Sequence, residues 1–140
     1  MNWGILGTSF ISGVMAEAIN SDPDSHLYAV AGRSEQNLSL FADQYSVGTR
    51  YTDYEALLND DLVDIIYIAL PNHVHHDFII KAAQRGKAIL CEKSLSVDME
   101  KTELALQAAI TIKAVMKSIK NLDVRMAIGI GDEDFTATSV

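Results

Sequence analysis

The sequence predicts an α/β fold, a three-layer, doubly wound parallel sheet with helices on both faces. Short apolar runs alternate along it with segments of helical periodicity, and glycine, proline and asparagine separate them. The run 63–70 is nearly continuously apolar and rich in β-branched residues, which suits a strand covered on both faces. Alternation at this spacing indicates right-handed β-α-β crossovers.

The first element is a strand over residues 3–6, followed by a tight turn at Gly7, Thr8 and Ser9. A helix follows, with an apolar face predicted at Ile11, Val14, Met15, Ala18 and Ile19. Such a turn directs the N–H groups and the positive end of the helix dipole toward a pyrophosphate. In the dinucleotide-binding fingerprint Gly7 fills the first glycine position, Ser9 the second and Ser12 the third. An ordinary strand-to-helix connection would also explain this stretch.

The following elements alternate in the same way. A strand is predicted over 26–32, then a helix capped by Ser34, and a short strand over 49–52. The helix has an apolar face at Leu38, Phe41, Ala42 and Tyr45. A short helix over 54–59, the strand over 63–70, a helix over 74–85 ended by Gly86 and a strand over 88–91 follow. The helix over 74–85 has its apolar face at Phe78, Ile79, Ala82 and Ala83.

Length and composition predict one domain over residues 1–140, since 49% of the residues are hydrophobic. The net charge of −8 provides no basic stripe, so we expect neither nucleic acid nor an anionic membrane surface as a partner. No apolar run reaches transmembrane length, and the first residues carry no charged leader. The single cysteine, Cys91, fits a reducing compartment, so we expect a cytoplasmic protein.

Several candidate ligand-binding residues follow the strands, where ligands of doubly wound sheets bind. They are Thr8, Arg33, Pro71, Asn72, His73, Glu92 and Lys93. Arg33 and Ser34 follow the second strand, where an acidic residue would bind a ribose 2′-hydroxyl and an arginine a 2′-phosphate. This position therefore favours NADP over NAD, although NAD stays possible and a solvated strand-end arginine is the simpler alternative.

Three of the four histidines lie within residues 72–77. The spacing resembles the start of a metallo-hydrolase motif, but Phe78 stands where the motif requires histidine. We therefore expect no bound metal.

The last part of the chain is less regular. A long helix is predicted over 98–121 and a sixth strand over 122–130, whereas 132–134 and the Thr/Ser tail are expected to be solvated. Residues 110–140, which include the end of this helix and the sixth strand, are atypical.

Taken together, these stretches resemble the cofactor-binding domain of the glucose-fructose oxidoreductase, inositol dehydrogenase and MocA family, a Rossmann fold. The resemblance covers residues 1–109. Its matching pieces are 3–8 (WGILGT), Arg33-Ser34, 51–58 (YTDYEALL), 63–64, 67–76 (YIALPNHVHH) and 90–93 (LCEK).

The resemblance implies an NAD(P)-dependent oxidoreductase that acts on a sugar-like or other CH–OH substrate. It places the residues that bind the cofactor in four groups: Gly7, Thr8, Ser9, Phe10 and Ile11 at the pyrophosphate; Arg33 and Ser34 at the adenosine ribose; Leu70, Pro71, Asn72 and His75 along the cleft; and Glu92 at the nicotinamide ribose. Lys93 matches a lysine that positions and polarises the substrate, so it is the candidate catalytic residue.

Three features depart from the family. Ser94 stands where the family motif has proline, and Ser9 stands where the fingerprint has glycine. Family members also continue into a substrate domain, which we do not expect in this sequence. The isolated chain is therefore expected to be catalytically incomplete. The alternative is a nucleotide-sensing or oligomerising module without catalysis, and a homo-oligomer fits either case.

Overall fold

The computed structural model describes residues 1–92, 125–130 and 134–139 of the chain. The chain falls into two compact units, Met1–Ala69 and Leu70–Val140. Within the described residues, no helix combines the length and the apolar character that crossing a bilayer requires.

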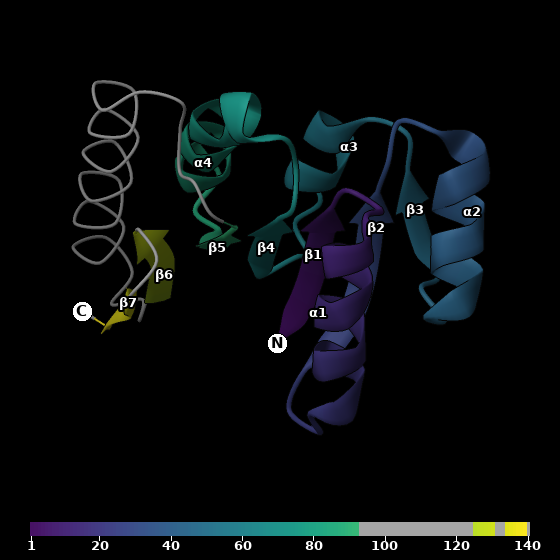
Figure 1. Ribbon diagram of the computed structural model, residues 1–140, viewed down its shortest axis with the longest axis horizontal. Coiled ribbons are helices and arrows are strands. Elements are labelled where there is room, and N and C mark those ends of the chain that lie inside the picture. Colours follow the sequence, from purple (N-terminus) through teal and green to yellow (C-terminus); the bar gives the residue numbers. More distant parts are fainter. Residues whose placement is uncertain (93–124, 131–133, 140) are drawn as a thin grey trace. The chain divides into compact units, whose positions relative to one another are not determined.

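The first unit alternates strands and helices throughout (Figure 1). In chain order these are β1 (Asn2–Leu6), α1 (Phe10–Ser21), β2 (His26–Ala31), α2 (Glu35–Gln44), β3 (Thr49–Tyr51), α3 (Tyr54–Leu58) and β4 (Ile65–Ile68). Its strands lie in the order β3-β2-β1-β4, and every pair is parallel. The doubly wound α/β fold that the sequence predicts is thus confirmed, and each predicted strand of this unit is present.

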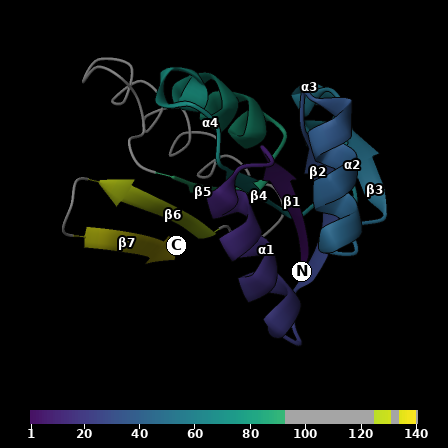
Figure 2. The ribbon, with the colours of Figure 1, turned by 45° about the vertical axis from the view of Figure 1, so that its right-hand side comes forward.

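The strand order decides which face each helix covers. The crossovers β1-α1-β2 and β2-α2-β3 step in one direction across the sheet, and β3-α3-β4 steps back. Because parallel crossovers are right-handed, α1 and α2 cover one face and α3 covers the other. Figure 2 shows α1 and α2 side by side on the same side of the strands.

Close packing on the α3 face requires a glycine in β1. A Cβ at Gly4 would lie 2.7 Å from Leu57 Cδ2 and 3.0 Å from Val63 Cγ1. Leu57 and Leu58 of α3 are completely buried. The short helix is therefore fixed to the sheet through its last residues.

The apolar face predicted for α1 is largely wrong. Ile11 and Val14 are 41% and 47% exposed, and the buried residues are Ser12, Gly13, Ala16 and Ile19. Small residues let the helix approach its neighbours closely: a Cβ at Gly13 would lie 2.5 Å from the Tyr45 hydroxyl oxygen. On α2 the predicted residues Leu38, Phe41 and Ala42 are buried, as expected.

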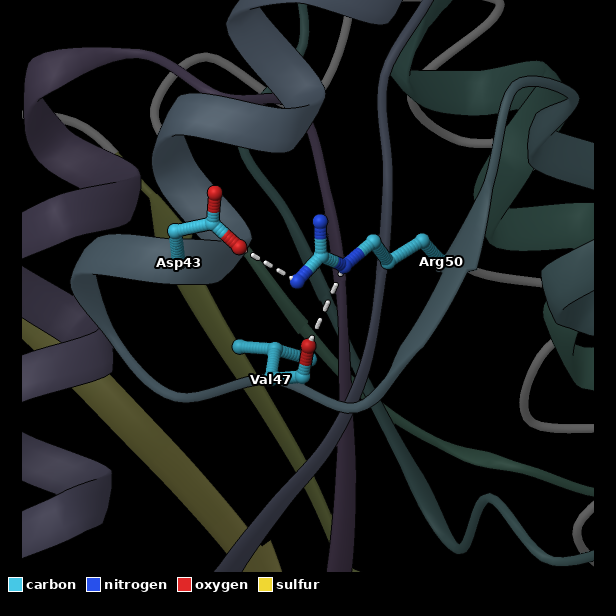
Figure 3. Close-up of polar contacts among 3 residues, drawn as sticks. All are labelled: Asp43, Val47 and Arg50. Carbon is cyan, nitrogen blue, oxygen red and sulfur yellow. Dashed lines mark hydrogen bonds and ion pairs between the residues drawn. The ribbon is translucent and has the colours of Figure 1, made fainter.

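The turn between α2 and β3 is closed by an arginine (Figure 3). Arg50 Nη2 lies 2.6 Å from Asp43 Oδ1 of α2, and Arg50 Nε donates to the Val47 carbonyl at 3.4 Å. Ser46, in the same turn, has a φ of 59°, in the left-handed region. Because Asp43 is largely exposed and Arg50 partly exposed, the ion pair adds at most about 1 kcal/mol to stability.

Side chains join the amino ends of the strands in this unit. The Asn2 backbone N–H donates to Asp64 Oδ2 at 2.7 Å, and the Asn2 side-chain amide donates to the Leu62 carbonyl at 2.8 Å. Trp3 Nε1 donates to Ser25 Oγ at 3.1 Å. These bonds tie β1 to the segments that lead into β4 and β2.

The second unit contains a 3₁₀ turn (Asn72–Val74), α4 (His75–Gln84) and the strands β5 (Ala88–Cys91), β6 (Arg125–Ile130) and β7 (Asp134–Ser139). The predicted α4 face is confirmed, because Phe78, Ile79, Ala82 and Ala83 are buried. Gly86, with a φ of 73°, follows the helix end as expected.

At the end of the chain the predicted sixth strand is confirmed, and a further strand that the sequence did not predict follows it. The sixth strand is present as β6, which pairs parallel with β5. The tail that was expected to be solvated forms β7, antiparallel to β6. Its threonines are β-branched, which favours strands, and β6 offers it an edge. The helix predicted over 98–121 lies outside the described residues.

Candidate functional site

The carboxyl ends of the first unit's strands are joined at the Gly7 turn. The Gly7 N–H donates to the Ala31 carbonyl at 2.9 Å, which ties the end of β1 to the end of β2. On the other side of β1, the Ala69 N–H donates to the Leu6 carbonyl at 3.0 Å. The strand order reverses between β1 and β4, and ligands of open α/β sheets bind at such a switch point.

The turn itself has the conformation that its glycine permits. Gly7 has a φ of 104°, which L side chains rarely adopt, so the first fingerprint position requires glycine here. Helix α1 begins three residues later with Phe10, which is 88% exposed. The N–H groups of Phe10 and Ile11 belong to the first turn of α1 and have no acceptor within the helix. This helix terminus is therefore suited to an anionic group.

The two serines of the fingerprint serve the start of the helix. Ser9 is the N-cap: its hydroxyl accepts a hydrogen bond from the Ser12 N–H at 3.4 Å and lies 3.2 Å from the Ser12 hydroxyl. Ser12 is fully buried, so a small side chain is needed at the third position. The Ser9 hydroxyl thus has a structural role in addition to the phosphate contact that the sequence suggests.

The loop after β2 passes directly beside the turn. A Cβ at Gly32 would lie 2.9 Å from Thr8 Cγ2, so these two residues meet at close range. The Gly32 N–H donates to the Tyr51 carbonyl at 3.0 Å, which adds the end of β3 to the same edge. Arg33 follows Gly32 and is exposed. The structure therefore brings the Gly7 turn and the Arg33 loop together, as the sequence predicts.

Arg33 is held by a ring and not by an acid. Its guanidinium carbon lies 5.5 Å from the centroid of the Tyr54 ring, at the start of α3. Among the residues that the structure describes, no carboxylate forms an ion pair with Arg33. Ser34 is the N-cap of α2, as predicted, and its hydroxyl accepts from the Asn37 N–H at 3.3 Å. An uncompensated guanidinium beside a helix N-terminus is suited to a phosphate.

Sequence reasoning missed the contact between Arg33 and Tyr54. The two residues lie 21 positions apart, and only the pairing of β2 with β3 brings them together. No local pattern of residues indicates such a contact.

The candidate residues at the start of the second unit differ in exposure. Pro71 and Asn72 are exposed, and Leu70 is buried. His75 is completely buried, and its Nε2 lies 2.5 Å from the Leu70 carbonyl oxygen. His75 therefore fixes the segment that carries Pro71 and Asn72, and it presents no surface to solvent.

The last candidates follow β5. Cys91 is buried, and this burial, with the nearby Glu92 carboxylate as a smaller cause, raises the pKa of the thiol to about 12. The thiol therefore stays protonated at neutral pH and is no nucleophile. Glu92 is half-buried, and Lys93 and Ser94 lie outside the described residues.

The histidine cluster forms a small local pair. His76 Nε2 lies 3.0 Å from Asp77 Oδ1, and His76 Nδ1 has no hydrogen-bond partner among the described residues. Within residues 1–92 and the two described strands beyond them, no three His, Cys, Asp or Glu side chains are arranged to hold a metal ion.

A hollow of about 450 Å³ lies between α1 and α2. Its lining includes Thr8, Ser9 and Phe10 at the glycine turn, together with Gly13 and Tyr45. The flank of the turn is therefore open to solvent within the first unit.

Comparison with known proteins agrees with this geometry. The model of an oxidoreductase family with an NAD-binding Rossmann fold matches residues 1–118. The chain is 40% identical over 102 residues to the D-xylose 1-dehydrogenase (NADP(+)) 2 of Haloferax volcanii, an alignment that covers 73% of this chain and 31% of that protein. It thus spans about a third of the length of this relative.

Solved structures show the same fold. A biliverdin reductase from Synechocystis, in complex with biliverdin and NADP+, is 30% identical with a TM-score of 0.76, over 80% of this chain and 35% of that one. An NAD-binding oxidoreductase from Klebsiella pneumoniae is 27% identical with a TM-score of 0.79, and the match covers 92% of this chain and 34% of that one. The chain therefore belongs to the glucose-fructose oxidoreductase, inositol dehydrogenase and MocA family of oxidoreductases and comprises the family's NAD(P)-binding Rossmann domain.

Proposed function

We propose that this chain binds NADP in preference to NAD, with the pyrophosphate at the Gly7 turn and the 2′-phosphate at Arg33 and Ser34. The observation that carries the proposal is the close approach of these two loops, since a Cβ at Gly32 would lie 2.9 Å from Thr8 Cγ2. One molecule can then contact both loops. The NADP in the names of the Haloferax and Synechocystis proteins supports the same choice.

The residues present fit such a cofactor. Gly7, with its φ of 104°, leaves open the space that a Cβ would fill, so the backbone can approach a pyrophosphate closely. The N–H groups of Phe10 and Ile11 supply donors for it. Arg33 supplies in-plane N–H donors that match phosphate oxygens, and the Ser34 hydroxyl can donate while it caps α2.

In the second unit, we propose that Leu70, Pro71 and Asn72 line the cofactor cleft and that the buried His75 holds their segment in place. Glu92 is proposed to lie at the nicotinamide ribose. Lys93 is the proposed catalytic residue, because an ammonium group beside a carbonyl stabilises the negative charge that develops on its oxygen.

When bound, NADP would supply the hydride-transferring nicotinamide. The proposed activity of the protein is oxidation of a sugar-like CH–OH group, a substrate class that the D-xylose dehydrogenase supports by its name. The cytoplasmic location and the homo-oligomer stay predictions from the sequence, as does a single domain over residues 1–140.

Coenzyme titration of matched arginine variants tests the proposal. Trp3 is the single tryptophan of the chain, so energy transfer from Trp3 to the reduced nicotinamide reports binding of NADPH and NADH. We expect Arg33→Ala to weaken NADPH about 10- to 100-fold and NADH little, because it removes charge-assisted hydrogen bonds to the 2′-phosphate. Arg50→Ala is the control, since Arg50 is already paired with Asp43.

Equal affinities of the unmodified chain for NADPH and NADH would contradict the NADP preference. Absence of binding by both coenzymes would contradict the cofactor site itself and favour a Rossmann scaffold without nucleotide function.

A further inference from the structure

The contact between Arg33 and Tyr54 lies at the edge where the 2′-phosphate is proposed to bind. Tyr54 follows β3 by three residues, and Arg33 follows β2 by two. The Gly32 N–H bond to the Tyr51 carbonyl joins these two strand ends at 3.0 Å. We infer that Tyr54 is a positioning residue that holds the Arg33 guanidinium for the 2′-phosphate and thereby strengthens the choice of NADP over NAD. This inference rests on the proposed function.

Tyr54 is well suited to hold another side chain, because its own position is fixed. The helix that it begins is capped by Asp53, whose carboxylate accepts from the Glu55 N–H at 3.2 Å. Leu57 and Leu58, on the following turn, are completely buried. The loop after the helix is tied back to β3, because the Tyr51 hydroxyl donates to Asp60 Oδ2 at 2.8 Å.

Arg33, in contrast, has little else to fix it. It is exposed, and it forms no ion pair within the described part of the chain. A long side chain in this situation samples many rotamers and loses that freedom when it binds a phosphate. A ring beneath the guanidinium reduces the loss, because part of the ordering is present before the ligand arrives.

Holding the guanidinium in this way does not use up its charge or its hydrogen bonds. An aromatic face attracts a cation without accepting an N–H bond from it in the guanidinium plane. An acidic partner, such as the one that Arg50 has, would neutralise the group and compete with the phosphate. The ring, and not the phenol hydroxyl, is therefore the part of Tyr54 that matters.

The test compares Tyr54→Leu, which removes the ring, with Tyr54→Phe, which keeps it. The readout is the ratio of the NADH to the NADPH dissociation constant, measured on the full chain by energy transfer from Trp3. We expect Tyr54→Leu to lower this ratio about two- to tenfold through weaker NADPH binding, and Tyr54→Phe to keep it. Tyr28→Leu, which removes a half-buried ring within β2, controls for a general effect on the fold.

An unchanged ratio in Tyr54→Leu would overturn the inference. A ratio that falls in Tyr54→Phe as much as it does in Tyr54→Leu would overturn it as well. If Tyr54→Leu does not fold, Tyr54→Met gives the same comparison with more of the side-chain volume kept. In an Arg33→Ala background, Tyr54→Leu should leave the ratio unchanged. If Arg33→Ala alone leaves the ratio unchanged, the proposed function fails together with the inference. If Arg33→Ala abolishes the preference and Tyr54→Leu does not lower it, only the role of Tyr54 fails.

Discussion

The amino and carboxyl ends of the strands in the first unit differ in the side chains that link them. Backbone hydrogen bonds join both ends: the His26 N–H donates to the Met1 carbonyl at the amino ends, and the Gly7 N–H donates to the Ala31 carbonyl at the carboxyl ends. The amino ends carry side-chain links in addition, from Asn2 to Asp64 and to the Leu62 carbonyl, and from Trp3 to Ser25.

This difference separates a structural end from the proposed binding end. Side-chain donors and acceptors at the amino ends are already satisfied within the protein, so they add to stability. At the carboxyl ends the backbone holds the strands together, and Arg33 lies against the Tyr54 ring and forms no ion pair with a carboxylate among the described residues. Substitutions at the carboxyl ends should therefore change cofactor binding, and those at the amino ends should change only stability.

The largest effect is expected from Gly7→Val at the carboxyl end of β1. A β-branched residue is strained at a φ of 104°, and its side chain would occupy the space proposed for the pyrophosphate. We expect the affinity for NADPH to fall at least about 100-fold, as measured by energy transfer from Trp3. Gly48→Ala is the control, because no atom lies within 4 Å of a Cβ there. Gly7→Val with unchanged affinity would show that the pyrophosphate binds elsewhere.

A smaller effect is expected at Cys91, which ends β5 in the second unit but is buried. Because burial raises the thiol pKa from 9.0 to about 12, the folded chain keeps this proton after the unfolded chain has lost it. The stability that this provides is present below pH 9 and is lost as the pH rises toward 12. At pH 10 the loss is about 1.4 kcal/mol.

Urea unfolding at pH 8 and pH 10 checks this expectation. The free energy of unfolding should fall less between these two pH values in Cys91→Ala than in the unmodified chain. NADPH affinity at pH 8 should be the same in both, since the thiol has no part in the proposed site. Parallel pH profiles of stability would show that the thiol is accessible to solvent.

The smallest effect is expected from Ser25→Ala at the amino ends. The variant loses the hydrogen bond from Trp3 Nε1 and the 2.6 Å bond from the Ser25 hydroxyl to Asp22, which lowers the pKa of that carboxyl. We expect the free energy of unfolding to fall by about 1 kcal/mol, with unchanged affinity for NADPH. Because Trp3 is the fluorescent probe, calorimetric titration is the appropriate binding measurement here. Weaker binding would contradict the separation of the two ends.

Much of the first unit follows from local patterns in the sequence. β-Branched residues indicate the strand at residues 65–68. Ser34 could be predicted as a helix cap because it precedes an apolar pattern with helical spacing. The face of α1 could not be predicted in this way. The buried residues Ser12, Gly13 and Ala16 are small, and their burial depends on how closely α1 packs against other elements. A prediction from hydrophobicity alone places Ile11 and Val14 in the core instead, and both are exposed.

In the candidate site, too, some residues could be predicted from local sequence patterns and others could not. Gly7 and Arg33 were predictable, because each follows a recognisable strand and the carboxyl ends of parallel strands share one edge. The Tyr54 contact required the register between β2 and β3, which no local pattern encodes. The role of His75 also depended on tertiary structure, since a histidine beside a strand end can face a ligand or, as here, a buried carbonyl.

Amide chemical shifts followed during an NADPH titration show which end of the strands binds the cofactor. We expect the amide signals of Gly7, Thr8, Phe10 and Arg33 to shift on binding, and the amide signal of Ser25 at the amino ends to stay unchanged. Shifts centred on Ser25, or saturating binding that leaves Gly7 and Arg33 unmoved, would contradict this expectation.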